Sequence, residues 1–292
     1  MKLTVGIPTY NEEDSIVDCI KSCFNQTYPP DEIIVVASGC TDKTVPNIEE
    51  LMNEDERIKL VVEKERNGKI SAINLILSKS KGDIVVHTDG DVLLSNDSLE
   101  KLVYYFDKYP FVSSVSGTCQ IVENKSRIFY EWSKKTVNIL NRNKAKLFKE
   151  GNFFHLCGYI FAHRKGAITN VPQVKGATDA TMGSILKSKG KIIFDPSIIA
   201  YVKHTNNVRD FIRQKARIRY GFLCLNESHD SNRTASSELV FIRTLFTNNN
   251  LKVNIGFLFI CLLYLASWLK AHYWFSREVT LNEVWKPVIS TK

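Results

Sequence analysis

Short apolar runs alternate with amphipathic stretches along residues 2–91. The run at 32–37 is mostly Ile and Val, which predicts a strand buried on both faces. In the stretch before it, Ile16, Ile20, Cys23 and Phe24 fall on one face of a helix. We expect strands at 2–7, 32–37, 58–62 and 84–87, and helices that begin at Asn11, at Thr41-Asp42 and at Lys69, with Asn11 as the cap of the first. This series predicts a parallel sheet with right-handed crossovers.

The order of elements changes after Asp91. We expect a helix at 96–109, a strand at 111–122, a basic helix at 125–149, a strand at 153–162, a helix at 178–189 and two short strands at 191–194 and 198–202. A chain of 292 residues suits one large α/β domain with an appendage. The sequence therefore predicts an α/β domain at 1–227, a linker at 228–250 and a hydrophobic C-terminal segment at 251–292.

Asp89-Gly90-Asp91 lies just after the expected strand at 84–87. In extended chain, two carboxylates one residue apart project to the same side, where they repel each other unless a cation lies between them. Such oxygen ligands suit Mg²⁺ or Mn²⁺, which keep open positions for substrate phosphates. Ligands of open α/β sheets bind at the carboxyl ends of the strands. Because Asp-Gly is also ordinary turn chemistry, the assignment depends on the neighbouring segments.

Other loops are expected at the same edge of the sheet. Residues 5–13 combine a strand end, Pro8, Tyr10 and a helix N-terminus, which offers N–H groups and an aromatic ring to a nucleotide. Residues 35–44 form a second loop, and Gly68-Lys69 places a lysine where it can neutralise a phosphate. Each segment also has a plain structural reading, as a strand-to-helix turn or a solvated lysine.

The charge and cysteine content narrow the class of protein. A net charge of +8 and a pI near 9.0 favour nucleotide phosphates, phospholipid surfaces or nucleic acid as partners. The seven cysteines are odd in number and contain no Cys-x-x-Cys pair, so we expect a reducing cytosol, with neither a disulfide framework nor a zinc site. Cys19 and Cys23 are expected in the core. No basic segment leads into a hydrophobic stretch at the N-terminus, so we expect no signal peptide.

In this order the segments resemble the family 2 glycosyltransferases, whose fold is the Rossmann-like GT-A fold with a mostly parallel sheet. The resemblance covers residues 3–225. Its pieces are Ile7-Pro8-Thr9-Tyr10-Asn11-Glu12, Gln26-Thr27-Tyr28-Pro29, Ser38-Gly39-Cys40-Thr41-Asp42, Gly68-Lys69 with Ala72 and Asn74, and Asp89-Gly90-Asp91. The resemblance implies transfer of a sugar from a nucleoside diphosphate donor to an acceptor hydroxyl, usually with inversion at the anomeric carbon.

The resemblance also implies roles for single residues. Asp89 would contact the ribose or the metal, and Asp91 would hold the Mn²⁺ or Mg²⁺ that bridges the donor diphosphate. Lys69 matches a lysine near the nucleotide. Gln214 and Arg217 match a Gln-x-x-Arg-Trp element that closes over donor and acceptor. The positions expected to line the nucleotide-sugar pocket are Pro8, Thr9, Tyr10, Glu12 and Ser38.

The acceptor hydroxyl also needs a base. The family supplies it from a Glu-Asp pair at a helix start, and the matching segment here is 176–180, followed by a glycine-to-proline stretch at 190–196. Asp179 is therefore the candidate base, with a pKa that partial burial beside Asp91 would bring toward the operating pH. In its structural reading, Asp179 stabilises the N-terminus of its own helix.

The sequence departs from the family pattern at three places. Ala37-Ser38 stands where an acid usually contacts the nucleoside, which leaves the base open, with uridine favoured. Thr178 replaces a glutamate, and Ile218 replaces the tryptophan of processive synthases. We expect a metal-dependent, inverting, non-processive transferase that acts on a glycan or lipid-linked acceptor.

Residues 255–269 are apolar on every face and end at Lys270. This run is shorter than the about 20 residues of a bilayer span, unless Lys270 and His272 snorkel. Trp268, Tyr273 and Trp274 would suit a membrane interface, and the flanking basic residues would suit an anionic leaflet. These basic residues are Arg243, Lys252, Lys270 and Arg277. We expect attachment to the cytoplasmic face of the cell membrane; the alternative is a core helix packed on the domain or in a homodimer.

Other classes fit the sequence less well. The first strand is not followed by Gly-x-Gly-x-x-Gly, as in dinucleotide-dependent oxidoreductases, and Gly68-Lys69-Ile70 lacks the Ser or Thr of a phosphate-loop NTPase. A sugar-nucleotide pyrophosphorylase would have a glycine-rich N-terminal loop with a lysine. A degenerate sugar- or membrane-binding scaffold remains open because of Ala37, Thr178 and Ile218. Nucleic-acid binding is the other interpretation of the positive charge, but we expect no nucleic-acid partner.

Overall fold

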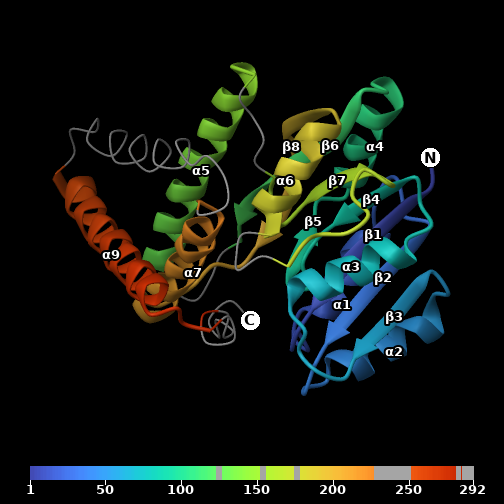
Figure 1. Ribbon diagram of the computed structural model, residues 1–292, viewed down its shortest axis with the longest axis horizontal. Coiled ribbons are helices and arrows are strands. Elements are labelled where there is room, and N and C mark those ends of the chain that lie inside the picture. Colours follow the sequence, from blue (N-terminus) through green and yellow to red (C-terminus); the bar gives the residue numbers. More distant parts are fainter. Residues whose placement is uncertain (123–126, 152–155, 174–177, 227–250, 281–283, 285–292) are drawn as a thin grey trace.

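The computed structural model describes residues 1–122, 127–151, 156–173, 178–226, 251–280 and 284. Within them, an eight-stranded sheet with the order β3-β2-β1-β4-β7-β6-β8-β5 forms the centre of the fold (Figure 1). This is the mixed, mostly parallel α/β architecture that the sequence predicts.

The N-terminal half follows the predicted strand–helix series. Its parallel strands are β1 (Leu3–Thr9), β2 (Glu32–Ser38), β3 (Ile58–Glu63) and β4 (Ile84–His87), joined by α1 (Ile16–Phe24), α2 (Thr44–Glu54) and α3 (Lys69–Lys79). β2 is buried on both faces, because Val35 belongs to the cluster that contains Ile16 of α1, while Ile34 packs with Ile76 of α3. The carboxyl ends of β1, β2 and β4 therefore meet at one edge of the sheet.

In the second half, the direction of β7 positions the residues around the acids. The elements are β5 (Val92–Leu94), α4 (Ser98–Lys108), β6 (Val112–Ile121), α5 (Arg127–Lys149), β7 (Phe161–Arg164), α6 (Thr178–Lys189) and β8 (Lys191–Val202). β7 runs antiparallel to β4, and Phe161 pairs with His87. The residues just before β7 therefore lie beside the segment that follows β4.

Several expected elements differ from the observed ones. Asn11 does not cap a helix: its φ is 53°, its side chain bonds Thr41, and α1 begins only at Ile16, after a turn closed by Glu12. The two strands expected at 191–194 and 198–202 are one strand, β8, because the long β6 pairs with both halves through a register shift. The strand expected at 153–162 is β7, at Phe161–Arg164, and residues 152–155 lie outside the described part.

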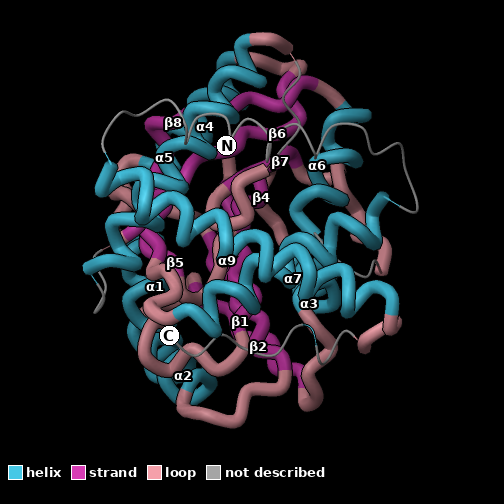
Figure 2. Tube along the Cα trace, turned by 90° about the vertical axis from the view of Figure 1, so that its left-hand side faces the viewer, coloured by secondary structure: helices cyan, strands magenta, loops and turns pink. Residues whose placement is uncertain are grey.

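Three helices group at one end of the molecule, on the left in Figure 1. They are α5, α7 (Val208–Asn226) and α9 (Leu251–Ser276), and in the view from that end α9 and α7 lie in front of the sheet (Figure 2). Tyr220 of α7 packs with Ala271 and Trp274 of α9. Among the described helices, none combines the length and the apolar character that crossing a membrane requires. The linker expected at 228–250, with Arg243, lies outside the described residues.

The core contains histidines that are held neutral by burial. His163 Nε2 lies 3.0 Å from His87 Nε2, and His204 Nδ1 lies 2.8 Å from Ser133 Oγ. Burial lowers the pKa of His163 to about 4 and the pKa of His204 to about 3. In the unfolded chain a histidine has a pKa of about 6.5.

We expect the free energy of unfolding to decrease as the pH falls below about 6.5. Below that pH the histidines bind protons in the unfolded chain but stay neutral in the folded protein. Acidification therefore favours the unfolded state and lowers the free energy of unfolding, by about 2 kcal/mol for each of these histidines at about pH 5. Urea unfolding at about pH 7.5 and pH 5 measures the difference. His163→Gln should reduce this difference, whatever its effect at pH 7.5. An undiminished pH difference in the variant would contradict the assignment.

Candidate active site

Asp89 and Lys69 form an ion pair at the carboxyl end of β4. The Nζ atom of Lys69 lies 2.7 Å from Oδ1 and 2.9 Å from Oδ2 of Asp89. Burial opposes the charge of Lys69, but the carboxylates of Asp89, Asp179 and Asp91 outweigh it and raise the pKa of the lysine. The structure therefore brings the two predicted acids, the predicted lysine and the candidate base into one electrostatic neighbourhood.

Asp91 is the carboxylate whose charge is least compensated in this group. Burial, followed by the charges of Asp89 and Glu12, raises its pKa to about 7. Such convergence of acids is the condition that a bound cation would relieve. The described residues contain no cluster of three or more His, Cys, Asp or Glu side chains able to hold a metal. Two carboxylates nevertheless suit Mg²⁺ or Mn²⁺, because these ions complete their coordination with water and substrate phosphates. The donor set at Asp89 and Asp91 fits the expected metal.

The end of β1 faces the acids closely. A Cβ atom at Gly90 would lie 2.7 Å from Thr9 Oγ1, so only glycine allows this approach. Thr9 Oγ1 is buried and has no hydrogen-bond partner among the described residues. Next to it, the guanidinium of Arg66 stacks over the ring of Tyr10 at 4.1 Å. Pro8 pairs with Val36 in the adjacent strand. Together these residues form a surface with an aromatic ring and an unused hydroxyl beside the carboxylates.

Glu12 and Ser38 hold the loops around this surface. The backbone N–H of Glu12 donates to Thr44 Oγ1 at 2.7 Å, and its carboxylate accepts a hydrogen bond from Ser15. The Ser38 Oγ atom accepts from the backbone N–H of Asn67 at 3.1 Å, which ties β2 to the loop before Lys69. Both residues thus fix the predicted nucleotide loops through contacts within the chain.

Glu63 is a residue of this region that the sequence interpretation missed. It pairs with Ser38 in the register of β2 and β3, and it supplies a carboxylate beside the position where Ala37-Ser38 lacks one. Its Oε1 atom accepts from Asn67 Nδ2 at 3.0 Å and from Ser71 Oγ at 2.6 Å, while Oε2 is buried without a partner in the described part of the chain. The signal in the sequence was an acid at the end of an expected strand.

Asp179 lies in the first turn of α6, against the segment that precedes β7. A Cβ atom at Gly158 would lie 2.2 Å from Asp179 Oδ2, so the carboxylate fits here only because position 158 has no side chain. Burial is the main cause that raises the pKa of Asp179, with Asp89 adding to it, while Lys69 and Lys144 act against it. A raised pKa brings a carboxylate closer to the range in which a general base works well. Gly176 and Ala177, which precede it, lie outside the described residues.

Helix α7 brings Gln214 and Arg217 to the same region. Burial lowers the pKa of Arg217, and the neighbouring Tyr159, Asp89 and Asp91 act in the opposite direction. Gln214 is buried, and its Oε1 atom has no hydrogen-bond partner among the described residues. The predicted element therefore offers an arginine charge near the acids and an amide oxygen that a sugar hydroxyl could satisfy. The structure thus places the predicted residues together, while their roles stay predictions.

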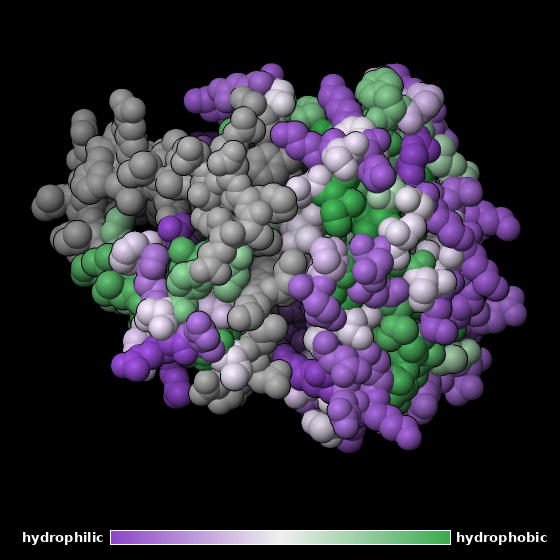
Figure 3. All heavy atoms as spheres, in the orientation of Figure 1, coloured by the Kyte–Doolittle hydropathy of each residue, from purple (hydrophilic) through white to green (hydrophobic). Residues whose placement is uncertain are grey.

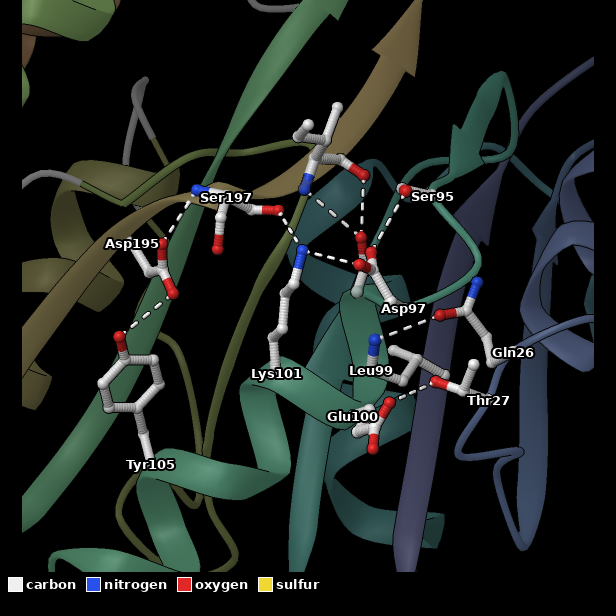
Figure 4. Close-up of polar contacts among 12 residues, drawn as sticks. Gln26, Thr27, Ser95, Asp97, Leu99, Glu100, Lys101, Tyr105, Asp195 and Ser197 are labelled. Atoms are coloured by element: carbon white, nitrogen blue, oxygen red, sulfur yellow. Dashed lines mark hydrogen bonds and ion pairs between the residues drawn. The ribbon is translucent and has the colours of Figure 1, made fainter.

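A separate surface hollow of about 290 Å³ lies between α4 and β8. Its polar groups bind one another (Figure 4): Tyr105 Oη donates to Asp195 Oδ2 at 3.0 Å, and Lys101 Nζ bonds the Ser197 carbonyl at 3.0 Å and Asp97 at 2.6 Å. These contacts join α4 to β8 and leave little polar capacity for a ligand. The acids at the end of β4 are therefore the candidate active site.

Comparison with known proteins identifies the family that this chain resembles. The family model described as Glycosyl transferase family 2 matches residues 4–171. An uncharacterized glycosyltransferase of Haemophilus influenzae is 29% identical over 169 residues, which cover 52% of this chain and 67% of that protein. The putative teichuronic acid biosynthesis glycosyltransferase TuaG of Bacillus subtilis is 31% identical over 115 residues, which cover 39% of this chain and 46% of TuaG.

Solved structures share the fold at low sequence identity. The mannosyltransferase PcManGT from Pyrobaculum calidifontis, in complex with GDP-Man and Mn²⁺, has a TM-score of 0.63 at 21% identity and covers 97% of this chain and 87% of its own. S. aureus TarS 1–349 in complex with UDP-GlcNAc has a TM-score of 0.55 at 16% identity, with coverages of 97% and 77%. At these identities the likeness shows the GT-A fold.

Proposed function

Because the chain belongs to glycosyltransferase family 2, we propose that it transfers a sugar from a nucleoside diphosphate donor to an acceptor hydroxyl, with a divalent metal and with inversion at the anomeric carbon. The observation that carries this proposal is the meeting of Lys69, Asp89, Asp91 and Asp179 where β4 ends. A site for phosphates and a base for a hydroxyl are the two requirements of such a transfer.

In this mechanism, each residue acts on a particular part of the reaction. Asp179 accepts the proton of the acceptor hydroxyl as that oxygen attacks the anomeric carbon. Lys69 and Arg217 lie near the charge that develops on the departing diphosphate and stabilise it. Mn²⁺ or Mg²⁺ held by Asp91 and Asp89 would supply Lewis-acid stabilisation of the same leaving group.

The nucleoside is proposed to lie between Tyr10 and the end of β2. Thr9 Oγ1 is a buried polar atom without a partner among the described residues, so a base or a ribose that reached it would supply the missing hydrogen bond. The Glu63 carboxylate interacts with the Ser38 side chain at the end of β2. Glu63 can take the role of the acid that the family usually carries at Ala37-Ser38, because an acceptor beside Ser38 suits the imino N–H of uracil. Uridine is therefore the favoured nucleoside, although GDP-Man and UDP-GlcNAc occupy the similar proteins PcManGT and TarS.

The sequence of α7 supports the proposal that the enzyme adds a single sugar rather than a polymer. Ile218 stands where processive synthases carry a tryptophan, and its side chain is 45% exposed. The acceptor that we propose is a glycan or a lipid-linked precursor.

Release of nucleoside diphosphate from a panel of UDP-, GDP- and dTDP-sugars tests the proposal. We expect one donor to be turned over with Mn²⁺ or Mg²⁺ and not with EDTA. Binding without turnover would indicate that the acceptor is missing, and membrane lipid extracts would then be added. If calorimetry detected no donor binding and the whole panel gave no turnover, a degenerate sugar- or membrane-binding scaffold would be the better description.

Association with the cytoplasmic face of a membrane is the second part of the proposal. Hydrophobic residues gather at the surface over α9 (Figure 3). The large exposed apolar side chains of this helix are Phe259, Leu262, Leu265, Trp268, Leu269 and Tyr273. Burial lowers the pKa of Lys270, and the charges of Arg213 and Arg209 lower it further, so cations gather beside this surface. An apolar stripe beside cations suits an anionic lipid surface.

We expect Leu265→Glu combined with Leu269→Glu to reduce co-sedimentation with anionic phospholipid vesicles at least tenfold, because charges replace apolar side chains at the surface. Leu140→Glu, at a similarly exposed leucine of α5, is the matched control and should bind as the original protein does. Release of nucleoside diphosphate should be unchanged in both. A homodimer in light scattering that the double variant dissociates, without vesicle binding, would instead favour a protein interface.

A further inference from the structure

A turn at residues 157–160, just before β7, lies against the carboxylate of Asp179. The turn is closed by a hydrogen bond from the backbone N–H of Ile160 to the carbonyl of Cys157 at 3.0 Å. A Cβ atom at Gly158 would lie 2.2 Å from Oδ2, 2.8 Å from Cγ and 3.2 Å from Oδ1 of Asp179. The three nearest atoms therefore all belong to the carboxyl group of the candidate base, so this turn determines where that group can lie.

The turn needs glycine at position 158 for space and not for backbone conformation. Gly158 does not belong to the described glycines with a positive φ, which are Gly39, Gly68, Gly151, Gly166 and Gly190. An alanine could therefore adopt the same backbone, and its methyl group would meet the end of one short side chain. Gly158→Ala should thus displace the carboxylate of Asp179 and leave the turn in place.

The hydroxyl of Thr88 fixes the turn to the end of β4. Thr88 Oγ1 donates to the carbonyl of Tyr159 at 2.9 Å, and Thr88 is buried immediately before Asp89. On the other side of the turn, the backbone N–H of Cys157 donates to Ser116 Oγ of β6 at 2.8 Å. One short path of contacts therefore joins the metal-binding acids to the candidate base: the backbone from Asp89 to Thr88, the hydrogen bond to the turn, and the turn itself.

We propose that Thr88 is a positioning residue for the base, because its hydroxyl holds the turn that places Asp179 relative to the metal-binding acids. The inference rests on the proposed transferase function, in which Asp179 takes the proton of the acceptor hydroxyl while Asp89 and Asp91 bind the diphosphate through the metal. The bond that forms and the bond that breaks share the anomeric carbon, so the base and the acids must keep a fixed separation. A misplacement of about 1 Å can lower a rate by about 10²-fold.

Transfer of labelled sugar and binding of nucleoside diphosphate with Mn²⁺ are the two measurements on Thr88→Val. This substitution preserves the shape of the side chain and removes the hydrogen-bond donor, so transfer should fall by about tenfold or more while binding is unchanged. Thr88→Ser keeps the hydroxyl and should restore transfer. Ser114→Ala is the matched control, because Ser114 Oγ donates to the carbonyl of Ala162 in β7 at 2.7 Å. It loses the same kind of buried bond farther along β7 and should transfer sugar as the original protein does.

A double-mutant cycle shows whether Thr88 acts through the base. Gly158→Ala should also lower transfer in the original protein. In an Asp179→Asn background, Thr88→Val and Gly158→Ala should cause no further loss, because the group that they position can no longer take a proton. The inference is overturned if Thr88→Val lowers transfer equally in both backgrounds, or if it weakens the binding of nucleoside diphosphate as much as it lowers transfer.

Urea unfolding tests the contact between the turn and Asp179 without any substrate. Gly158→Ala should lower the free energy of unfolding in the original protein. In an Asp179→Ala background it should cost less or be stabilising, because no carboxylate meets the new methyl group and alanine restricts the unfolded chain. An equal cost in both backgrounds would overturn the inference. Because this cycle needs no donor, its outcome is separate from that of the proposed function, which is judged by turnover of the donor panel.

Discussion

Asp91→Asn is expected to lower metal-dependent release of nucleoside diphosphate about a thousandfold or more. The substitution keeps the size of the side chain and removes the charge that holds the cation, and a bound metal contributes several kcal/mol to the stabilisation of a leaving group. The measurement is turnover of the accepted donor as a function of Mn²⁺ concentration. Asp18→Asn, at an exposed position on α1, is the control and should keep the original rate.

The same variant should remain folded, because the charge of Asp91 is unfavourable without a cation. Burial and the nearby Asp89 and Glu12 already oppose that charge. The melting temperature of Asp91→Asn in EDTA should therefore equal or exceed that of the original protein. Mn²⁺ with nucleoside diphosphate should raise the melting temperature of the original protein and not of the variant. A variant that melts early and still turns over donor with metal would show that Asp91 has a structural role.

The parallel half of the fold and the position of the acids could be predicted from local pattern. The strand before Asp89 is a run of Ile and Val, and its carboxyl end must lie where parallel neighbours end. The spacing of apolar residues also predicted α3, and with it the place of Lys69. The order of strands and helices in this half follows from local sequence pattern, so it could be predicted.

Features set by contacts distant in sequence could not be predicted in the same way. The antiparallel direction of β7 brings Gly158 against Asp179, and no local pattern encodes that approach. Glu63 joins the nucleotide loops because β3 pairs in register with β2. The expected cap at Asn11 was wrong for a related reason, since its side chain bonds Thr41 in the neighbouring loop.

Asp91 and Lys215 are two buried groups with one physical property in common. The pKa of Asp91 is raised to about 7 and the pKa of Lys215 is lowered to about 8, mainly by burial. In both groups, burial therefore disfavours the charged form. A cation bound together with a diphosphate would stabilise the charged form of Asp91. Groups of this kind mark functional sites because stability alone does not favour them.

Asp179→Asn is expected to reduce sugar transfer to an acceptor by about 10²–10⁴-fold, because asparagine cannot take the proton of the hydroxyl. Donor binding should be retained, since Asp89 and Asp91 are untouched. The measurement is transfer of labelled sugar from the accepted donor to membrane lipid extract. In the original protein the rate should rise with pH as the base loses its proton, with the rise above the range of an ordinary aspartate, because burial raises the pKa of Asp179.

Comparison with two other variants separates catalysis by Asp179 from stabilisation of α6. Asp107→Asn, on the exposed face of α4, should leave transfer unchanged, and Asp179→Glu should restore part of it and keep the dependence on pH. A carboxylate that only stabilises the helix N-terminus would contribute about 0.3–1 kcal/mol to folding, and its loss would lower the melting temperature without changing the pH profile of transfer. That outcome, with the acceptor reaction intact, would remove Asp179 from the role of base and direct the search for a base to other residues near Lys69.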